Sequence, residues 1–497
     1  MRKAVTLFGM LLCLILMSVS NASALTNISG NVAADTIWGP GSLTVPDTAY
    51  RMQGTVFVQA PATLTIEPGV TIYGDEATSG TLVVERGAKI HAVGTLAQPI
   101  VFTTSRVIDG GILDRGLWGG IMIAGDAPIN VPGGVSTIEG TSGTYGGLNP
   151  SDNSGEIQYV RVEYAGHLFT PTVELNGIAF FGVGNGTTVD HVQVHMNKDD
   201  CIEMFGGTVN MKYMIGTWCR DDSFDWTEGW TGKAQFVVAS QRADEADRGI
   251  EADNSSIDNE ATPRSHPVIY NMTLVGDPYT TYGIESTQGM VLRLGTAAEI
   301  RNVIVTGFKS HGIRVDDAST VAQANAGALD IENAIICGNN GGGVQYDADA
   351  LPFVGNVWWT NHYACASGLP NGDAQLCNPL PGDIYGSIDP TKQYKPNFAP
   401  APGSPAISGA VATPPNDGFF DTSVNFIGAV DPNNDWTYGW TNLGAQKQLV
   451  GDTNYSDTVR IADVVKVNRI SNLLDTIQDC VDANNSGGIT VADVVQI

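Results

Sequence analysis

The stretch VQVHMNKDDCIEMFGG, residues 192–207, reads as a short alternating strand, a polar turn and a second short strand. The stretch MKYMIGTWCRDDSFDW, residues 211–226, repeats this plan. Related phrases follow, and each has a small residue or a cysteine near the start of its second strand: Cys201, Ser223, Gly249, Gly283, Gly312 and Gly343. This spacing is typical of repeats of about 20–45 residues in which each coil stacks on its neighbours.

The repeated phrase predicts an all-β parallel β-helix. One coil cannot bury its apolar residues alone, and the alternation along each strand sends Val and Ile inward and polar residues outward. A β-sandwich also strings short strands together, but it does not require the same phrase at nearly every step. The parallel β-helix is therefore the better interpretation.

Earlier stretches carry a family resemblance. GTVFVQAPATLTIEPGVTIYG (54–74) and GLWGGIMIAGDAPIN (116–130) resemble the opening coils of secreted bacterial right-handed parallel β-helix proteins with a pectate-lyase-like scaffold. The resemblance extends over about residues 45–440 and implies a right-handed solenoid within residues 25–440. It does not imply an activity, because this scaffold carries lyases, hydrolases, adhesins and stalks. Residues 352–440 lose the period and are predicted to form an irregular cap that closes the solenoid's end.

Export is predicted from the first 24 residues. A basic start, an apolar run and Ala22-Ser23-Ala24 are typical of a secretory signal peptide, so we expect a secreted, extracellular or cell-surface protein without a membrane span. The net charge of −27 disfavours binding to nucleic acid. Disulfides are expected in an exported chain, and Cys365 with Cys377 is the best candidate pair.

Acidic doublets precede two of the repeated strands: Asp199-Asp200 and Asp221-Asp222. Coils stacked in register would bring these four carboxylates together on one face. One interpretation is a ladder of turn aspartates that accept backbone hydrogen bonds, with bound cations or without them. The other is a polysaccharide-cleaving site, because paired carboxylates hydrolyse glycosides and DDCIE resembles a stretch of the polygalacturonases. A third doublet, Asp316-Asp317, lies further along the chain.

Two further sets of side chains have alternative interpretations. His191 and His195 have the even spacing that places two side chains on one face of a strand, as an outward polar face or as a metal pair. Six tryptophans are candidates either for stacking on sugar rings or for filling the irregular edges of the solenoid: Trp226, Trp230, Trp358, Trp359, Trp436 and Trp440.

The last residues carry two copies of an acidic loop. Oxygen-bearing residues recur at loop positions 1, 3, 5 and 12, and position 7 offers a backbone carbonyl, as in calcium-binding loops. The first copy supplies Asp452, Asn454, Ser456, Thr458 and Asp463, and the second supplies Asp482, Asn484, Ser486, Gly488 and Asp493. Val464, Val467, Ile470 and Leu474 follow the first loop at helical spacing. These loops therefore predict bound Ca²⁺.

The paired loops and exit helix resemble a type I dockerin over residues 450–497, joined to the β-helix by a linker at 441–449. The resemblance implies a small α-helical calcium-binding module and a cohesin-like partner. Loop positions 10 and 11 carry partner choice in dockerins, and here they are Ile461-Ala462 and Val491-Ala492. Because the chain given ends shortly after Asp493, the second exit helix is expected to be truncated.

Together these patterns predict a calcium-binding β-helix protein that is tethered in an extracellular assembly and binds or acts on polysaccharide. The alternatives are a polysaccharide hydrolase or lyase that uses Asp199, Asp200, Asp221 and Asp222, and a non-catalytic adhesin or stalk.

Overall fold

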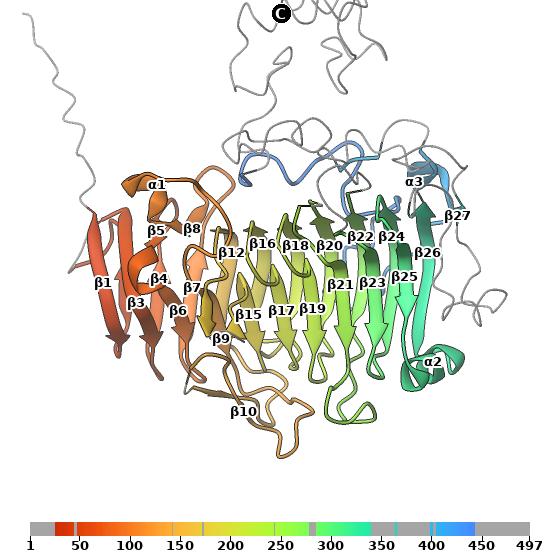
Figure 1. The fold of residues 1–497 in the computed structure, drawn as a ribbon, viewed down its shortest axis with the longest axis horizontal. Helices are drawn as coiled ribbons and strands as arrows, with labels where there is room; N and C mark the ends of the chain where they lie inside the picture. Colours follow the sequence, from red (N-terminus) through yellow and green to blue (C-terminus); the bar gives the residue numbers. More distant parts are fainter. Residues whose placement is uncertain are drawn as a thin grey trace, which may run out of the picture.

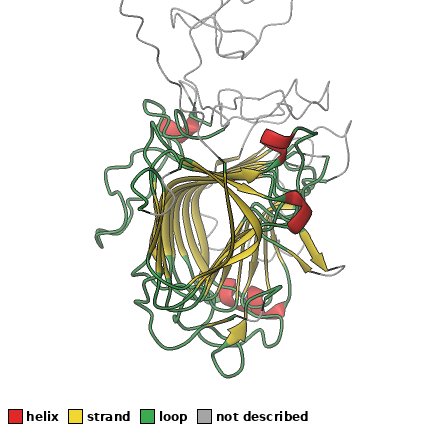
Figure 2. Cartoon of the chain, turned by 90° about the vertical axis from the view of Figure 1, so that its left-hand side faces the viewer, coloured by secondary structure: helices red, strands yellow, loops and turns green. Residues whose placement is uncertain are grey.

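Parallel strands from successive coils stack side by side along one long solenoid (Figure 1). This computed structural model describes residues 25–43, 47–141, 143–170, 173–242, 244–277, 285–337, 339, 363–364, 398–400 and 404–442. Viewed along the long axis, the strands enclose one interior (Figure 2). The predicted all-β parallel β-helix is therefore confirmed. Within the described ranges, none of the helices is long and apolar enough to cross a membrane.

Several predictions concern residues outside these ranges. They are the signal peptide at 1–24, the Cys365–Cys377 pair, Trp358 and Trp359, the predicted 441–449 linker from residue 443 onward, and the calcium loops within 450–497.

One face of the solenoid is a continuous stack of parallel strands in register. Its strands, in order along the axis, are β6 (Thr81–Val84), β9 (Gly120–Ala124), β15 (Ile178–Phe181), β17 (Ile202–Phe205), β19 (Phe224–Thr227), β21 (Arg248–Asp253), β23 (Gln288–Arg293) and β25 (His311–Val315).

The remaining wall is built from longer strands. In the later coils these are β12 (Gly155–Glu163), β16 (Thr188–His195), β18 (Asn210–Thr217), β20 (Lys233–Ser240), β22 (Val268–Val275), β24 (Ala298–Thr306), β26 (Leu329–Cys337) and β27 (Tyr363–Ala364). The first coils contain β1 (Thr26–Val32), β2 (Thr36–Trp38), β3 (Ala49–Val58), β4 (Thr63–Ile66), β5 (Thr71–Gly74), β7 (Lys89–Val93) and β8 (Ile100–Thr104).

Small elements decorate the coils. Two antiparallel ribbons project from the solenoid, β10 (Ser136–Thr137) with β11 (Thr144–Tyr145) and β13 (Leu168–Thr170) with β14 (Val173–Glu174). The short helices are η1 (Glu76–Thr78), α1 (Arg106–Asp109), α2 (Ala318–Asn325) and α3 (Pro405–Ser408).

The core consists of columns of inward side chains, one from each coil. Val192, Met214, Val237, Met272 and Val303 are consecutive partners in the register, and all are buried. In the early strands β4 and β7 every second residue is buried, as the alternation predicts. The later strands β20 and β22 are buried at nearly every position, because another part of the chain covers their outer face.

That cover is residues 404–442, here called the return segment. It runs back along the side of the solenoid, from the coils of β24 and β26 toward β16 (Figure 1, blue). Its Ile427, Val430 and Trp440 form an apolar cluster with outward residues of the strands, among them Ile215 and Val238. The sequence predicted a cap over the solenoid's end, whereas the described part of this region lies along a lateral face.

The register also corrects one step of the predicted period. Ile202, Phe224, Ile250, Met290 and Ile313 are consecutive partners, so the small residue of the fourth coil of this set is Gly289. The repeat spacing predicts Gly283 as the small residue at the start of this strand. The loop between β22 and β23 is longer than in an evenly spaced repeat, so β23 begins later in the sequence than the period predicts.

Candidate functional site

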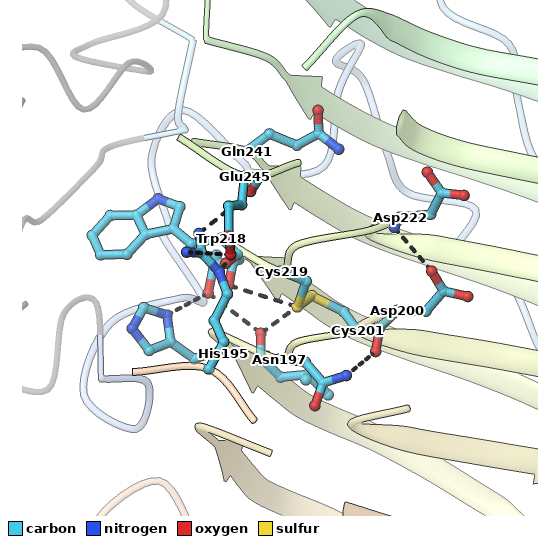
Figure 3. The surroundings of a disulfide bond; sticks show 12 residues. His195, Asn197, Asp200, Cys201, Trp218, Cys219, Asp222, Gln241 and Glu245 are labelled. Atoms are coloured by element: carbon cyan, nitrogen blue, oxygen red, sulfur yellow. Dashed lines mark hydrogen bonds and ion pairs between the residues drawn. A yellow bond between two sulfur atoms is a disulfide. The ribbon is translucent and has the colours of Figure 1, made fainter. Parts of the chain in front are cut away.

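The two predicted acidic doublets lie in successive turns at the start of β17 and β19. The Asp222 backbone N–H donates to Asp200 Oδ1 at 2.9 Å (Figure 3). The Arg248 N–H donates in turn to Asp222 Oδ1 at 2.6 Å. Each carboxylate therefore accepts a hydrogen bond from the next coil. This is the ladder of turn aspartates that the sequence predicts, and it explains why Asp200 and Asp222 are buried.

Three further acids continue the cluster along the strands. Glu203, Asp225 and Glu251 are direct partners in the register of β17, β19 and β21. The same outward column is apolar in the earlier coils, where Met122 and Ala179 precede Glu203. The outer face of this sheet thus changes from apolar to acidic at β17.

The carboxylates are close enough to share ligands. In four overlapping groups, one oxygen from each member lies within 4.8 Å of the others. The groups are Asp199–Asp200–Asp221, Asp200–Glu203–Asp225, Asp221–Asp222–Asp247 and Asp222–Asp225–Glu251. These eight residues are called the acidic face below. Oxygen atoms at this density are the donor set that hard divalent cations prefer.

Burial and mutual repulsion change the titration of the acidic face. Burial raises the pKa of Asp199 to about 7, and the neighbouring charges of Asp221 and Glu174 act in the same direction. Burial also raises the pKa of Glu251 to about 7, even though Arg248 and Arg293 oppose the change. The pKa values of Asp200, Glu203, Asp222 and Asp225 are likewise raised well above the usual range, again mainly by burial.

Two arginines neutralise part of this charge. Arg248 lies 2.5 Å from Asp247, 2.7 Å from Glu251 and 3.8 Å from Asp222. Arg293 pairs with Glu251 and with Asp253. Eight carboxylates facing two arginines leave an excess of negative charge, and Asp225 Oδ1 is buried without a hydrogen-bond partner among the described residues.

The basic residue directly before the second doublet contacts another element. Arg220 does not pair directly with its own doublet. It forms an ion pair with Glu174 of the β13–β14 ribbon at 3.0 Å, although its charge still lowers the pKa of Asp199. The direct contact of this arginine is therefore with the β13–β14 ribbon and not with Asp221-Asp222.

A cavity of about 420 Å³ opens beside the acidic face, and both Asp221 and Asp247 line it. Its other wall includes Asp244, which is held by Arg242 and by the buried Arg115. Burial raises the pKa of Asp244, but its bonds to these arginines outweigh burial and lower the pKa to about 2. The cavity is therefore lined mainly by acids, and it gives solvent access to one of the carboxylate groups.

A disulfide joins the two acidic turns. Cys201 directly follows Asp200, and Cys219 lies just before Asp221; the two sulfurs are bonded (Figure 3). Beside the bridge, Asn197 donates to the Asp200 carbonyl at 2.7 Å. The repeat pattern does not predict this pair, because Cys201 and Cys219 occupy different places in their repeats.

The third doublet lies elsewhere. Asp316 pairs with Arg314, and Asp317 caps α2 by accepting from the Thr320 N–H at 2.9 Å. Both follow β25, whereas the first two doublets precede their strands. Asp317 therefore stabilises a helix start, and neither Asp316 nor Asp317 belongs to the acidic face.

The two histidines do not form a metal pair. His191 has a left-handed backbone conformation (φ 53°), which breaks the alternation of β16. Its ring stacks between Tyr159 and Tyr213, with 4.2 Å between ring centroids on each side. His195 contacts Trp218 instead and is buried, and burial lowers its pKa to about 3.

Most of the described tryptophans serve the core. Trp226, Trp230 and Trp440 are buried, so they cannot stack on a sugar from solvent. The indole N–H groups of Trp226 and Trp230 donate to Thr296 Oγ1 and the Val209 carbonyl. Trp436 is only partly buried and lines a second cavity.

Glu203, Asp225, Asp247 and Glu251 were missed from the sequence, although a signal was present. DDCIE, DDSFD and DRGIE carry an acid at the same place of three successive repeats. Parallel stacking in register turns such a repeated acid into a column of neighbouring carboxylates.

The fold and the acidic face define a β-helix protein with a polyanionic surface on one strand stack. The chain matches the family of pectate-lyase-like β-helix domains over residues 41–349. This match spans more than half of the sequence, and the protein belongs to that family. The family suggests a function related to polysaccharides. No curated protein and no solved structure matches the chain significantly.

Proposed function

We propose that the acidic face binds divalent cations such as Ca²⁺ and, through them, an acidic polysaccharide. The observation that supports this proposal is the set of four overlapping carboxylate groups, each with oxygen atoms within 4.8 Å of one another. Carboxylates packed so closely repel one another unless they bind protons or cations. A bridging cation also removes the repulsion between this protein, which carries a net charge of −27, and an anionic polymer.

The spacing favours binding over hydrolysis. The two catalytic carboxyl groups of glycosidases are about 5–5.5 Å apart in retaining enzymes and about 6.5–9.5 Å apart in inverting ones. Here three carboxylates in each group bring one oxygen apiece within 4.8 Å of the others, which suits a shared cation better than a pair of groups on either side of a glycosidic bond. Asp200 and Asp222 also accept backbone hydrogen bonds, which hold their carboxylates in the turns. Arg248 forms ion pairs with three acids, so it is a poor proton acceptor for a lyase.

A polysaccharide hydrolase or lyase remains the second candidate, because one observation favours it. The pKa of Asp199 is raised to about 7, in the range that suits a general acid near neutral pH. In this reading Asp199 acts with Asp221, and Asp200 and Asp222 hold the turns in place.

Calorimetry with Ca²⁺ and then with polygalacturonate tests the proposal. Asp199→Asn and Asp225→Asn should each weaken Ca²⁺ binding at least tenfold and abolish calcium-dependent binding of the polymer. Asp417→Asn, which removes the same charge from a distant surface, should have no effect. Release of new reducing ends or unsaturated products, lost in Asp199→Asn, would favour the enzyme. If the unmodified protein binds neither Ca²⁺ nor polygalacturonate, the remaining interpretation is a non-catalytic adhesin or stalk.

The tethered role rests on the sequence of residues 450–497, and we propose it as a separate function. The paired loops would bind Ca²⁺ through Asp452, Asp463, Asp482 and Asp493, and the module would dock onto a cohesin-like domain of an extracellular assembly. Export through the predicted signal peptide agrees with the extracellular setting in which pectate-lyase-like domains often occur.

Stoichiometry separates the two calcium sites. In the full chain, replacing Asp452 and Asp482 by Ala should remove two bound Ca²⁺ ions without changing polygalacturonate binding, and it should abolish capture by immobilised cohesins. Unchanged Ca²⁺ stoichiometry in this double variant would refute the dockerin assignment. It would not contradict the proposal that the acidic face binds Ca²⁺.

A further inference from the structure

A column of residues with positive φ runs along the solenoid, one in each of seven successive coils. Each interrupts its strand at the same place in the register, where the wall turns a corner. The residues are Tyr159, His191, Tyr213, Phe236, Asn271, Asn302 and Asn333, with φ between 48° and 62°. Asn tolerates this left-handed conformation, whereas bulky aromatic residues pay a steric cost for it.

The asparagines of this column bind the return segment directly. Asn302 exchanges two hydrogen bonds of 2.8 Å with the backbone of Ala412. Asn271 donates to the carbonyls of Phe426 and Gly428 at 3.1 Å. At these coils the return segment therefore lies against the corner of the wall, and its backbone forms hydrogen bonds with the asparagine side chains.

At the aromatic coils the return segment leaves a cavity. The rings of His191, Tyr213 and Phe236 stack on one another, and Trp436 approaches Tyr213 edge-on at 5.3 Å between ring centroids. The cavity has a volume of about 320 Å³, which is at the lower end for sites of small organic ligands. Its lining includes the aromatic residues Tyr213, Phe236 and Trp436 and the acids Asp421, Asp431 and Asp435.

One of these acids has an unused acceptor. Asp435 Oδ1 accepts hydrogen bonds from the N–H and the hydroxyl of Thr437, at 2.9 and 2.6 Å. Asp435 Oδ2 is buried and has no hydrogen-bond partner among the described residues. A buried oxygen without a donor is costly, and because Asp435 lines the cavity, a small rotation of its side chain would let a ligand hydroxyl donate to this oxygen.

We infer that this cavity binds a single uncharged sugar residue. The edges of the stacked rings and the Trp436 indole offer apolar contacts to the C–H groups of a sugar ring, and carboxylates accept hydrogen bonds from its hydroxyls. The three acids of the cavity exclude a uronate by repulsion. The strained aromatic residues replace asparagine only in the coils that border this cavity, as expected when strain is retained for binding. The site lies on β16, β18 and β20, whereas the acidic face lies on β17, β19 and β21 and their preceding turns.

Ligand-observed NMR and calorimetry on the full chain test this inference, with the methyl glycosides of glucose, galactose, mannose and xylose as probes. A ligand of this size should bind with a Kd on the order of 1 mM. Asp435→Asn keeps the shape of the side chain and its bond with Thr437 but removes the charge, and it should weaken binding at least tenfold. Trp436→Ala should abolish binding if its melting temperature shows that it folds.

Two controls give the test its discrimination. Asp417→Asn makes the same change in the return segment outside the cavity, and Asp199→Asn alters the acidic face; both should bind the glycoside as the unmodified protein does. Failure of all four glycosides to bind, binding that survives Asp435→Asn, or equally tight binding of galacturonate would each overturn the inference. None of these results depends on whether the acidic face binds Ca²⁺.

Discussion

Raising the pH from about 5 to about 8 should destabilise the cation-free protein. In the folded state Asp199 and Glu251 have pKa values of about 7, compared with ordinary values of 3.8 and 4.5. The folded protein therefore holds these protons more tightly than the unfolded chain does. The resulting stabilisation is complete below the unfolded pKa values and is lost as the pH rises through 7.

The size of the effect follows from the shift. For Asp199, a change from 3.8 to about 7 corresponds to about 2–3 kcal/mol of stability lost between about pH 5 and pH 8. Glu251 contributes a similar amount, but the two contributions do not simply add, because the acids of this face titrate together. In a chain of this size we expect the melting temperature to fall by roughly 3–5 °C.

Thermal unfolding followed by circular dichroism in the presence of a chelator measures this fall. Ca²⁺ at one hundred times its Kd should restore about 2.7 kcal/mol at the higher pH, because it binds only the folded state. Asp199→Asn combined with Glu251→Gln should flatten the pH dependence. Asp417→Asn should not flatten it, because the bond and charge of Lys233 outweigh slight burial and lower the pKa of Asp417. A melting temperature that does not change with pH, or an equal slope in the double variant, would refute the reasoning.

Three further predictions concern the supports of the site. Replacing Cys201 and Cys219 by Ser should cost about 3 kcal/mol of unfolding free energy and weaken Ca²⁺ binding, because the bridge closes a short loop between the acidic turns; unchanged calorimetry would contradict this. Asn302→Ala should cost about 2–3 kcal/mol and speed proteolysis within the return segment, because Ala412 loses both bonds and Ala disfavours positive φ. Asp244 has a pKa of about 2, so its stabilisation is present above its usual pKa and lost as the pH falls toward 2; Asp244→Asn should flatten acid unfolding between about pH 4 and pH 2.

The solenoid could be predicted from the sequence because its contacts are between neighbouring repeats. A phrase that recurs once per coil places equivalent residues side by side, which is why Asp200 and Asp222 were correctly expected to meet. The same logic failed at Gly283 because a long loop shifts the next strand to Gly289. Periodicity predicts stacking well only where the loops between strands have similar lengths.

The return segment could not be predicted in the same way. It has no period, and its anchoring contacts join residues far apart in the chain, such as Gln193 and Asn442. Its aromatic cavity is therefore invisible in the sequence, although Trp436 was noted as a candidate for sugar stacking. The disulfide was missed for a related reason, since Cys201 and Cys219 meet across two coils without occupying equivalent positions.

The course of the return segment decides where the chain leaves the solenoid. Asn442 bonds with Gln193 on β16, so residues beyond it start from the flank of the rod and not from its tip. A load applied through the C-terminal part of the chain would therefore reach the hydrogen bonds between Asn442 and Gln193 first, before those of the corner asparagines. Under the proposed tethering, the rod would be held by its flank, with its long axis along the surface.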